Sequence, residues 1–504
     1  MFTFWKMPII IQCEIIIYYM FKTPIYQWGC EVRLVYQHHR SALAFRKKSI
    51  YWGKKQVERN KQNPNLTVGV DEKISVGKSI LLGFQHVLAM DLYIAPIIIA
   101  GLLAMDALNT TYFIQMCFLA AGIATLIQTI GGLRLPVVQG PSYVPIGALA
   151  AIGGKLGLGA VFGSLLPGAL LIAALGYPLK VFAKAVRKII PPIVGGTVIV
   201  IVGISLMPSA FNSIYHAPGN VGNNVLIAFV SAAVLVICIL LGRKMNGFGT
   251  FFRLVSVILA IVAGTITASL FGSVDFSPMK DAAWISLPQF FPFGAPVFDL
   301  QAILTMVFIY LVILVETTGT WFVVSTVTGS ELDDKRLNKA SVGEGLGCFV
   351  GSLFGGTPMT GYSSNAGIIA ITGVASRMAI VSAGFILIAL GLIPKLSALI
   401  TCIPEPVING IFGIVCVAIV MNGMKVIQNV VINDRNMMVI GLPILLTIGT
   451  VVLPSEILNS VPDFANYILS SGTAVGALAA VILNLIIPRD KIKVDESKQT
   501  PAAS

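Results

Sequence analysis

Five ionisable residues lie in or beside long apolar runs of this sequence, where a charge is costly to hold. They are His86, Asp91, Asp106, Glu316 and Glu344. A charged carboxylate at the centre of a bilayer costs about 2.5 to 3.5 kcal/mol on insertion scales, so such an acid usually binds a substrate, an ion or a proton. We therefore take Glu316, flanked by VFIYLVILV and TTGTW, as the principal substrate- or proton-binding candidate. The alternative is a protonated glutamate that is hydrogen-bonded within a helix bundle.

Gln85 and His86 are neighbours in the first apolar run. A glutamine side chain both donates and accepts hydrogen bonds, and a histidine exchanges a proton near neutral pH. On the sequence alone, His86 suits direct substrate contact and a structural bridge between two helices equally well. Asp91 is placed ~7.5 Å farther along the same predicted helix. At that position Asp91 is a third proton-coupling candidate, beside His86 and Glu316. The alternative is that Asp91 only lies near a water-filled cavity.

The elements that hold these residues must span a membrane. Apolar residues make up 56% of the 504-residue chain, charged residues make up 11%, and the mean hydropathy is +0.87. This composition excludes a set of soluble domains. The apolar runs are continuous rather than alternating, which excludes a transmembrane β-barrel. The sequence therefore predicts an all-α polytopic membrane protein, whose helices satisfy their own backbone hydrogen bonds.

Windows of about 20 apolar residues predict fourteen spans in two sets of seven. The first set is 79–104, 111–131, 137–153, 156–176, 190–208, 223–242 and 251–272. The second set is 300–323, 342–356, 360–375, 378–394, 405–421, 437–453 and 464–487. We accordingly expect a basic N-terminal extension, a first seven-span repeat, a second seven-span repeat and a cytoplasmic tail, at residues 1–74, 75–272, 300–487 and 488–504.

The distribution of basic residues predicts the orientation. Thirteen of the 34 Lys and Arg residues precede residue 79, against five acids, so +8 of the net charge of +12 lies before the first span. Four more are in the tail, and of the other seventeen only Lys155, Lys280 and Lys395 face outside if the N-terminus is cytoplasmic. This positive-inside bias places both termini in the cytoplasm. No aromatic RNA-binding pattern accompanies the basic residues, so we expect lipid rather than nucleic acid beside them.

Two predicted spans are short and interrupted by Gly, Pro or Ser. They are the third, VVQGPSYVPIGALAAIG (137–153), and the tenth, TGYSSNAGIIAITGVA (360–375), and each is third in its set. Matching breaks indicate an inverted repeat with a ligand site at the midplane; two kinked helices with satisfied backbones are the alternative. Ser363, Ser364 and Asn365 can hydrogen-bond a flat, polar, uncharged ring, although SSN also suits a turn or a helix cap.

The ninth span carries Gly343, Gly347, Gly351 and Gly355, one every four residues on a single helix face. Such a stripe lets two helix backbones approach closely, so we assign it a packing role.

Residues 8–21 form an apolar run that is too short to span, and we expect it to be interfacial or disordered. The seven cysteines show neither CxxC nor a metal-ligand spacing, so we expect no metal site.

Five motifs together resemble a known family of transporters. The motifs are QHVLAM (85–90), VVQGPSY (137–143), PPIVGGTVI (191–199), VETTGTW (315–321) and SNAGIIAITGVASR (364–377). In this order, over roughly residues 75–487, they are similar to the nucleobase-ascorbate transporter family. This family is also called class 2 of the nucleobase:cation symporters, and it includes bacterial uracil, xanthine and uric acid permeases.

The resemblance implies roles for particular residues. Glu316 matches the eighth-span glutamate with which the family binds the base, and His86 matches its first-span histidine. Ser142 and Tyr143 match a third-span pair whose backbone helps to hold the ligand opposite the tenth span. Thr320 departs from the pattern, because relatives carry an ionisable His or Asp at this position.

The tenth-span signature of the family is matched in part. Asn365, Gly367, Thr372 and Gly373 fit it, and we assign Gly367 and Thr372 structural roles. Ser364 stands where the family has Gln, Glu or Pro. In the family this Gln or Glu helps to bind the base, so the shorter Ser leaves room or requires a water molecule and indicates an unusual substrate. The predicted substrate-binding set is Gln85, Ser142, Tyr143, Glu316, Ser364 and Asn365.

The resemblance also implies a mode of action. A core domain of spans one to four and eight to eleven moves against a gate domain of spans five to seven and twelve to fourteen, in a homodimer in the cell membrane. We predict a secondary active importer of a purine or related nucleobase, of the xanthine, uric acid and guanine class. Symport of H+ is expected in preference to Na+, and no cofactor is expected.

Three alternatives to a purine importer were weighed. A uracil permease of the same family is the nearest. A sulfate or bicarbonate transporter of the same general fold would favour a fixed positive charge at the midplane, and the spans contain no such Lys or Arg. A membrane-embedded enzyme is disfavoured because His86 is the only one of four histidines inside a predicted span and no HExxH occurs.

Overall fold

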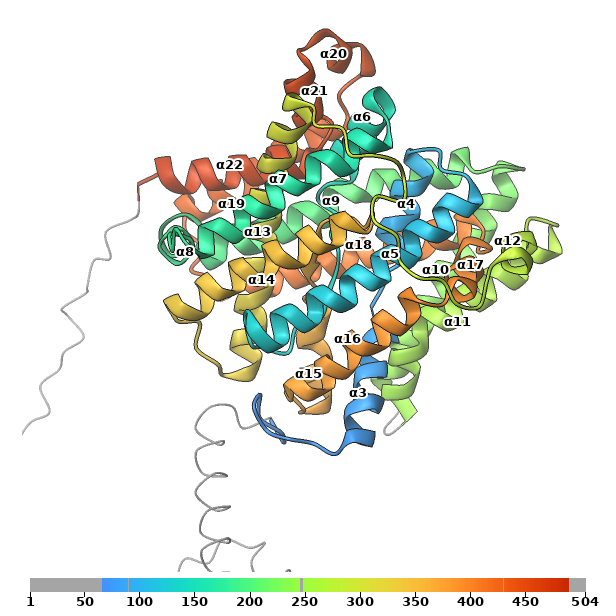
Figure 1. Cartoon of the computed structure of the whole chain (residues 1–504), viewed down its shortest axis with the longest axis horizontal. Coiled ribbons are helices and arrows are strands. Elements are labelled where there is room, and N and C mark those ends of the chain that lie inside the picture. The colour runs from blue at the N-terminus through green and yellow to red at the C-terminus, as the bar shows by residue number, and fades with distance from the viewer. Residues whose placement is uncertain (1–65, 89, 245–247, 429, 489–504) are drawn as a thin grey trace, which may run out of the picture. The chain divides into compact units, whose positions relative to one another are not determined.

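The structure is a computed structural model that describes residues 66–88, 90–244, 248–428 and 430–488. The predicted interfacial run at 8–21 lies outside the described residues, as does the predicted tail from residue 489 on. The described ranges form helices and one two-stranded sheet. They are shown in Figure 1.

The first half of the described chain contains one short strand among its helices. Its elements are α3 (Val76–Leu88), α4 (Ile94–Leu102), α5 (Ala107–Leu126), the π-helix η2 (Ile127–Gly131), β1 (Gln139–Pro141), α6 (Ile146–Leu156), α7 (Leu158–Gly176), α8 (Phe182–Ile189), α9 (Pro192–His216), α10 (Val221–Lys244), α11 (Phe248–Leu270) and α12 (Ser277–Asp281).

The second half contains the strand that pairs with β1. Its elements are α13 (Leu300–Thr328), α14 (Asp334–Leu353), β2 (Met359–Gly361), α15 (Ser364–Thr372), α16 (Arg377–Gly391), α17 (Pro394–Thr401), α18 (Glu405–Ile427), α19 (Asp434–Val451), α20 (Ser455–Ser460), α21 (Asp463–Leu469) and α22 (Gly472–Ile486).

Local signals in the sequence set the ends of several helices. Asp299 accepts a hydrogen bond from the Ala302 N–H and caps the start of α13, and Gly329 in the left-handed region (φ 64°) follows its end. Asp106 likewise caps α5 by accepting from the Asn109 N–H at 2.8 Å. Capping accounts for Asp106, which therefore needs no role in substrate or proton binding.

Seven helices in the described ranges are long and apolar enough to cross a membrane, and nine spans result if each sharply bent pair counts as one. The long ones are α5 with η2, α7, α9, α10, α13, α18 and α19. The bent pairs are α16 with α17 at 80° and α21 with α22 at 88°. At 1.5 Å per residue, even an 18-residue helix reaches about 27 Å, close to the hydrocarbon thickness. The chain is a multi-pass helical membrane protein.

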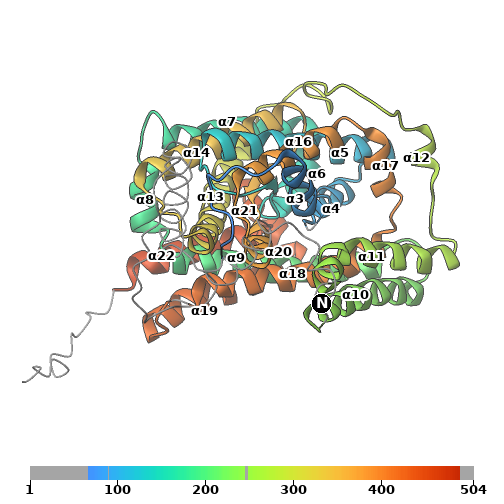
Figure 2. The same cartoon turned by 90° about the horizontal axis from the view of Figure 1, so that it is seen from below.

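The long helices of the unit from Lys61 onward lie in two layers. Figure 2 shows α5, α7, α14 and α16 in one layer and α9, α10, α11, α18 and α19 in the other. Within the first layer, α14 packs on α7 and α16 packs on α5; within the second, α18 packs on α9 and α10. The helix α13 contacts α7 on one side and α9 on the other, so it joins the two layers.

The prediction that Asp91 shares a helix with His86 is wrong. Helix α3 ends at Leu88 and α4 begins at Ile94, so Asp91 lies in the connection between them. The break suits the sequence, because Pro96 has no N–H to donate and fits best within the first turn of a helix, where that N–H would have no partner. The predicted continuous first span is thus two short helices.

The two segments that the sequence marks as interrupted meet in space. The strands β1 and β2 pair antiparallel, with Gly140 opposite Thr360. A short helix follows each strand, α6 in one case and α15 in the other. Pairing satisfies the N–H and C=O groups of the extended residues, which would otherwise be costly inside a membrane.

The last residues of the predicted N-terminal extension belong to the fold. Val68 forms a parallel bridge with Val374, and the Arg377 N–H donates to the Val70 carbonyl at 3.0 Å. Arg377 also forms an ion pair with Asp71. These contacts attach the chain before α3 to the C-terminal end of α15.

Candidate functional site

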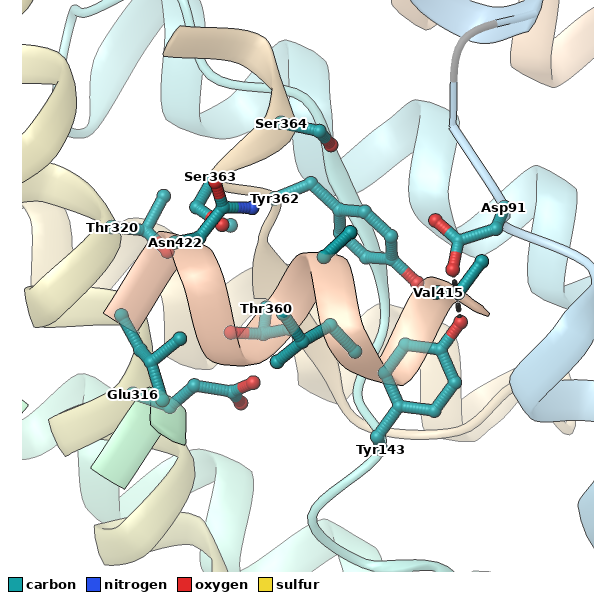
Figure 3. Close-up of a pocket in the computed structure, with 14 residues that line it drawn as sticks. Asp91, Tyr143, Glu316, Thr320, Thr360, Tyr362, Ser363, Ser364, Val415 and Asn422 are labelled. Carbon is teal, nitrogen blue, oxygen red and sulfur yellow. Dashed lines mark hydrogen bonds between the residues drawn. The ribbon is translucent and has the colours of Figure 1, made fainter. Parts of the chain in front are cut away.

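A cavity of about 80 Å³ lies where the two short strands meet α13 and α18. Its lining residues are Asp91, Tyr143, Ile199, Glu316, Thr320, Thr360, Gly361, Tyr362, Ser363, Ser364, Val415, Ala418, Ile419 and Asn422. Figure 3 shows Glu316 on one side of this cavity and Asp91 with Tyr143 on the other. The lining therefore comes from α13, from the segments around β1 and β2, and from α9 and α18 of the second layer.

Glu316 is held in place from the segment that follows β1. Its side chain is buried, and its Oε2 accepts a hydrogen bond from the Ser142 hydroxyl at 3.1 Å. The neighbouring Thr317 hydroxyl accepts from the Gly361 N–H of β2 at 3.0 Å. Helix α13 is thus bonded to both interrupted segments, and these bonds fix the carboxylate relative to the cavity.

The start of α15 offers free hydrogen-bond donors at the cavity. Ser363 and Ser364 line the cavity, and their N–H groups make no hydrogen bond with another described residue. The first N–H groups of a helix have no partner within the helix, and they carry the positive end of its dipole. They are therefore available to an acceptor atom of a ligand. Ser363 is the N-cap residue, but its side chain makes no capping bond.

Asp91 and Tyr143 form a hydrogen-bonded pair in the cavity wall. The Tyr143 hydroxyl donates to Asp91 Oδ2 at 2.5 Å. The Tyr143 ring stacks on Phe412 of α18, with ring centroids 5.5 Å apart. Tyr143 also lines a second cavity, of about 260 Å³, between α6, α9 and α22. Its ring thus stands between the two cavities and contacts the opposite layer.

His86, Asn365 and Gln85 are not among the residues that line the cavity. His86 Nδ1 lies 3.1 Å from Asn365 Oδ1, and both side chains are buried. The Asn365 Nδ2 has no partner in the described part of the chain. This pair joins α3 to α15, so its geometry is that of a bridge between two helices behind the cavity.

Glu344 of α14 is a second buried carboxylate close to the site. Its Oε2 accepts from Gln128 Nε2 at 2.6 Å, and the side chains of Thr317 and Gln139 lie near it. It interacts electrostatically with Glu316 but does not line the cavity. The two acids therefore lie on helices that follow one another in the chain, α13 and α14, with the polar side chains of Thr317 and Gln139 near Glu344.

The glycines of α14 lie against other helices. An added Cβ at Gly343 would meet Gln128, and one at Gly347 would meet Ala124 of α5 at 2.7 Å. Gly351 faces Ala120 of α5, whereas Gly355 lies beyond the end of α14. On α15, a Cβ at Gly367 would meet no atom within 4 Å, so close packing does not explain that glycine. The Thr372 hydroxyl donates to the Ile368 carbonyl at 2.9 Å.

Sequence reasoning did not identify several lining residues. Asn422 and three apolar residues come from α18, whereas Thr360 and Tyr362 come from the β2 segment. The Tyr362 hydroxyl donates to the Pro141 carbonyl at 2.9 Å. A polar Asn in the otherwise apolar sequence AIVMNGM is the signal that marks Asn422. Which residues share the cavity with Asn422 could not be read from the sequence.

The site can hold a planar, polar ligand. Glu316 offers acceptor oxygens, and the N–H groups at the start of α15 offer donors to the same cavity. Val415, Ala418 and Ile419 provide an apolar wall. No group of three or more His, Cys, Asp or Glu side chains that could hold a metal ion occurs in the described residues.

The family is established by sequence comparison. The model of the Permease family matches residues 77–456. The uric acid permease PucK of Bacillus subtilis is 34% identical over 417 residues, which cover 80% of this chain and 94% of that protein. The xanthine permease of Bacillus subtilis is 32% identical, with 81% of this chain and 94% of that protein covered. The chain therefore belongs to the Permease family.

Solved structures show the same fold at low sequence identity. The transmembrane domain of a cyanobacterium bicarbonate transporter, BicA, matches with a TM-score of 0.55 and 16% identity, covering 82% of this chain and 100% of that one. The murine anion transporter Slc26a9 in the inward-facing state matches with a TM-score of 0.52 and 14% identity, covering 91% and 76%. These likenesses concern the fold alone.

Proposed function

We propose that this chain is a secondary active transporter that imports a purine or related nucleobase by proton symport across the cell membrane. The observation that carries the proposal is the position of Glu316, a buried acid that lines the cavity between the two paired segments. A carboxylate there can accept ring N–H groups of a base, while the N–H groups at the start of α15 meet its carbonyl oxygens. The names of the relatives, uric acid permease and xanthine permease, support this substrate class.

The substrate-binding set is proposed from contacts as well as from the resemblance. Glu316, Tyr143 and Ser364 line the cavity, and Ser142 orients Glu316 through its hydrogen bond. Asn365 and Gln85 lie outside the lining, so we assign Asn365 the role of holding α15 through His86. For proton coupling we propose Glu316, with His86 and Asp91 as further candidates.

We infer a fourteen-span inverted repeat from the helices and the sequence together. The spans are α3 with α4, α5 with η2, β1 with α6, α7, α9, α10 and α11, then α13, α14, β2 with α15, α16 with α17, α18, α19, and α21 with α22. In this proposal the core domain runs from α3 to α7 and from α13 to α17, and the gate domain contains α9, α10, α11, α18, α19 and α21 with α22. Two interrupted segments, each third in its set, support this assignment.

Transport then requires the core to move against the gate. The cavity is lined from both proposed domains, by Glu316 and Ser364 of the core and by Asn422 of the gate, so a bound base contacts both. A ligand shifts the equilibrium between two states only by binding one of them more tightly. We also propose that both termini lie in the cytoplasm, which the positive-inside bias supports. The homodimer is proposed from the resemblance.

Uptake by a permease-deficient cell tests the proposed function. The wild-type chain is expected to take up a radiolabelled purine and to lose this uptake when an uncoupler collapses the proton gradient. Glu316→Gln is expected to reduce uptake at least about tenfold, because a hydrogen bond to a charged group is worth about 1.5 to 3 kcal/mol. Glu405→Gln serves as the matched control, because Glu405 is exposed at the start of α18.

The outcomes separate the candidate functions. Normal purine uptake by Glu316→Gln would contradict the proposed site. Uptake of uracil in preference to purines would favour the uracil permease of the same family. Uptake of sulfate or bicarbonate without any base would favour an anion transporter, although no Lys, Arg or His lines the cavity among the described residues.

A further inference from the structure

The cavity contains a second carboxylate that the proposed role of Glu316 leaves unused. Asp91 lines the cavity from the connection between α3 and α4. Figure 3 shows it on the opposite side from Glu316, with the Tyr362 ring beside Asp91. Tyr362 interacts electrostatically with both acids. A ligand in the cavity is therefore flanked by two carboxylates.

The contacts of Asp91 leave one of its oxygens for a ligand. Oδ2 accepts the Tyr143 hydroxyl at 2.5 Å, and the backbone N–H of Asp91 itself is the other donor to this carboxylate among the described residues. Tyr143 is itself held by stacking on Phe412. The carboxylate is thus oriented by a fixed partner, which lowers the entropy cost of binding a ligand to the remaining oxygen.

The two acids face each other without a compensating cation. None of the fourteen described residues that line the cavity is Lys, Arg or His. An ionised carboxylate offers only acceptors, so two of them on opposite sides complement a ligand with N–H donors on opposite edges. The same arrangement repels a negatively charged ligand, because like charges placed together in a binding site disfavour the wrong partner.

We propose that Asp91 is a second recognition residue, and that it makes the cavity select an uncharged, amino-substituted purine over an oxo-substituted purine that carries a negative charge. This inference rests on the proposed function, because it assumes that the cavity binds a base. Glu316 accepts the ring N–H groups at one edge, and Asp91 Oδ1 accepts the exocyclic amine at another. Ser364, where relatives have a longer side chain, leaves space for the ligand between the two acids.

Competition between two matched bases tests the inference. Guanine and hypoxanthine differ only in the exocyclic amine, and urate carries a negative charge at neutral pH. The full-length chain in a permease-deficient cell takes up radiolabelled hypoxanthine in the presence of each unlabelled competitor. In the wild type, guanine is expected to compete at least about tenfold better than hypoxanthine, because a site built to bond a polar group strongly rejects the analogue that lacks it. Urate is expected to compete poorest of the three.

Asp91→Asn tests the residue itself, since Asn has nearly the same shape without the charge. The guanine-to-hypoxanthine preference is expected to fall about tenfold, which corresponds to one charge-assisted hydrogen bond. Competition by urate is expected to improve. Asp106→Asn is the matched control, because it makes the same substitution at an acid that caps α5 and does not line the cavity, and it is expected to leave the guanine preference unchanged.

The possible failures are distinguishable. Absence of uptake of any base by the wild type contradicts the proposed function. If the wild type takes up a base but guanine competes no better than hypoxanthine, the inference is wrong and the proposed function still holds. This measurement is made on the wild type alone. Equal weakening of all three competitors in Asp91→Asn would show that Asp91 acts only by positioning Tyr143, which overturns its recognition role. Size-exclusion profiles of fluorescently tagged variants establish which of them fold.

Discussion

Gly195 of α9 and Gly319 of α13 lie back to back, and a Cβ added to Gly195 would stand 3.1 Å from the Gly319 Cα. Gly319 is three residues after Glu316 in the same helix. The absence of two side chains lets the helix that carries the candidate site approach the other layer closely. In the proposed mechanism this contact lies between the core and the gate, and α13 must slide past α9 during transport.

Gly319→Val is expected to lower the maximum rate of uptake more than the apparent affinity. Its Cβ would meet Ile199 Cδ1 at 2.9 Å and the Gly195 carbonyl oxygen at 3.1 Å. Overpacking of this kind costs about 1 to 3 kcal/mol, and 1.4 kcal/mol corresponds to a tenfold change in rate. Initial rates over a range of base concentrations measure both quantities. An unchanged maximum rate would argue against movement at this contact, and Gly413→Val is the control, because a Cβ at Gly413 meets no atom within 4 Å.

Ser142→Ala is expected to raise the KM for the base about tenfold. The substitution removes the hydroxyl that donates to Glu316 at 3.1 Å, and a hydrogen bond to a charged group is worth about 1.5 to 3 kcal/mol. The variant Ser164→Ala is the control, since the Ser164 hydroxyl donates to the Val161 carbonyl within α7 and is buried away from the cavity. A KM that responds equally to both substitutions would contradict a specific role for Ser142.

Gly345→Ala is expected to lower the Tm of the purified protein by several degrees. The new Cβ would lie 2.4 Å from the Ala173 backbone nitrogen of α7 and 2.6 Å from the Ala169 carbonyl oxygen, so the two helices must separate. By contrast, Gly441→Ala introduces a Cβ with no atom within 4 Å, and it should be neutral or stabilising because Ala favours a helix more than Gly does. Melting followed by the fluorescence of a thiol-reactive dye compares the two variants, and equal Tm values would contradict close packing of α14 on α7.

Single cysteines at basic positions are expected to label from opposite sides of the membrane. In the proposed orientation Lys280→Cys reacts with an impermeant maleimide added to whole cells, whereas Lys339→Cys reacts only in opened vesicles. The five cysteines in the described ranges are all buried, and replacing Cys13 and Cys30 by Ser removes the other two. Labelling of Lys339→Cys from outside would reverse the orientation derived from the positive-inside bias.

Local patterns in the sequence were sufficient for the long helices and for Glu316 and Ser364 of the candidate site. Runs of apolar residues, caps such as Asp299 and the terminating Gly329 act over a few neighbouring residues, so they can be read along the chain. Glu316 stands out for the same reason, because an acid in an apolar run is costly wherever the run packs. The interruptions near Gly140 and Ser364 were also visible, since Gly, Pro and Ser break a helix locally.

Contacts between distant segments were decided only by the tertiary structure. Gly140 and Thr360 pair across 220 residues, and no pattern within either segment specifies its partner. Asp91 was placed on the wrong element because its helix ends at Leu88, and its bond to Tyr143 depends on a segment 52 residues away. Side-chain chemistry and helix ends are local properties of the sequence, whereas the facing of two acids across one cavity results from packing, which brings together groups that are far apart in the chain.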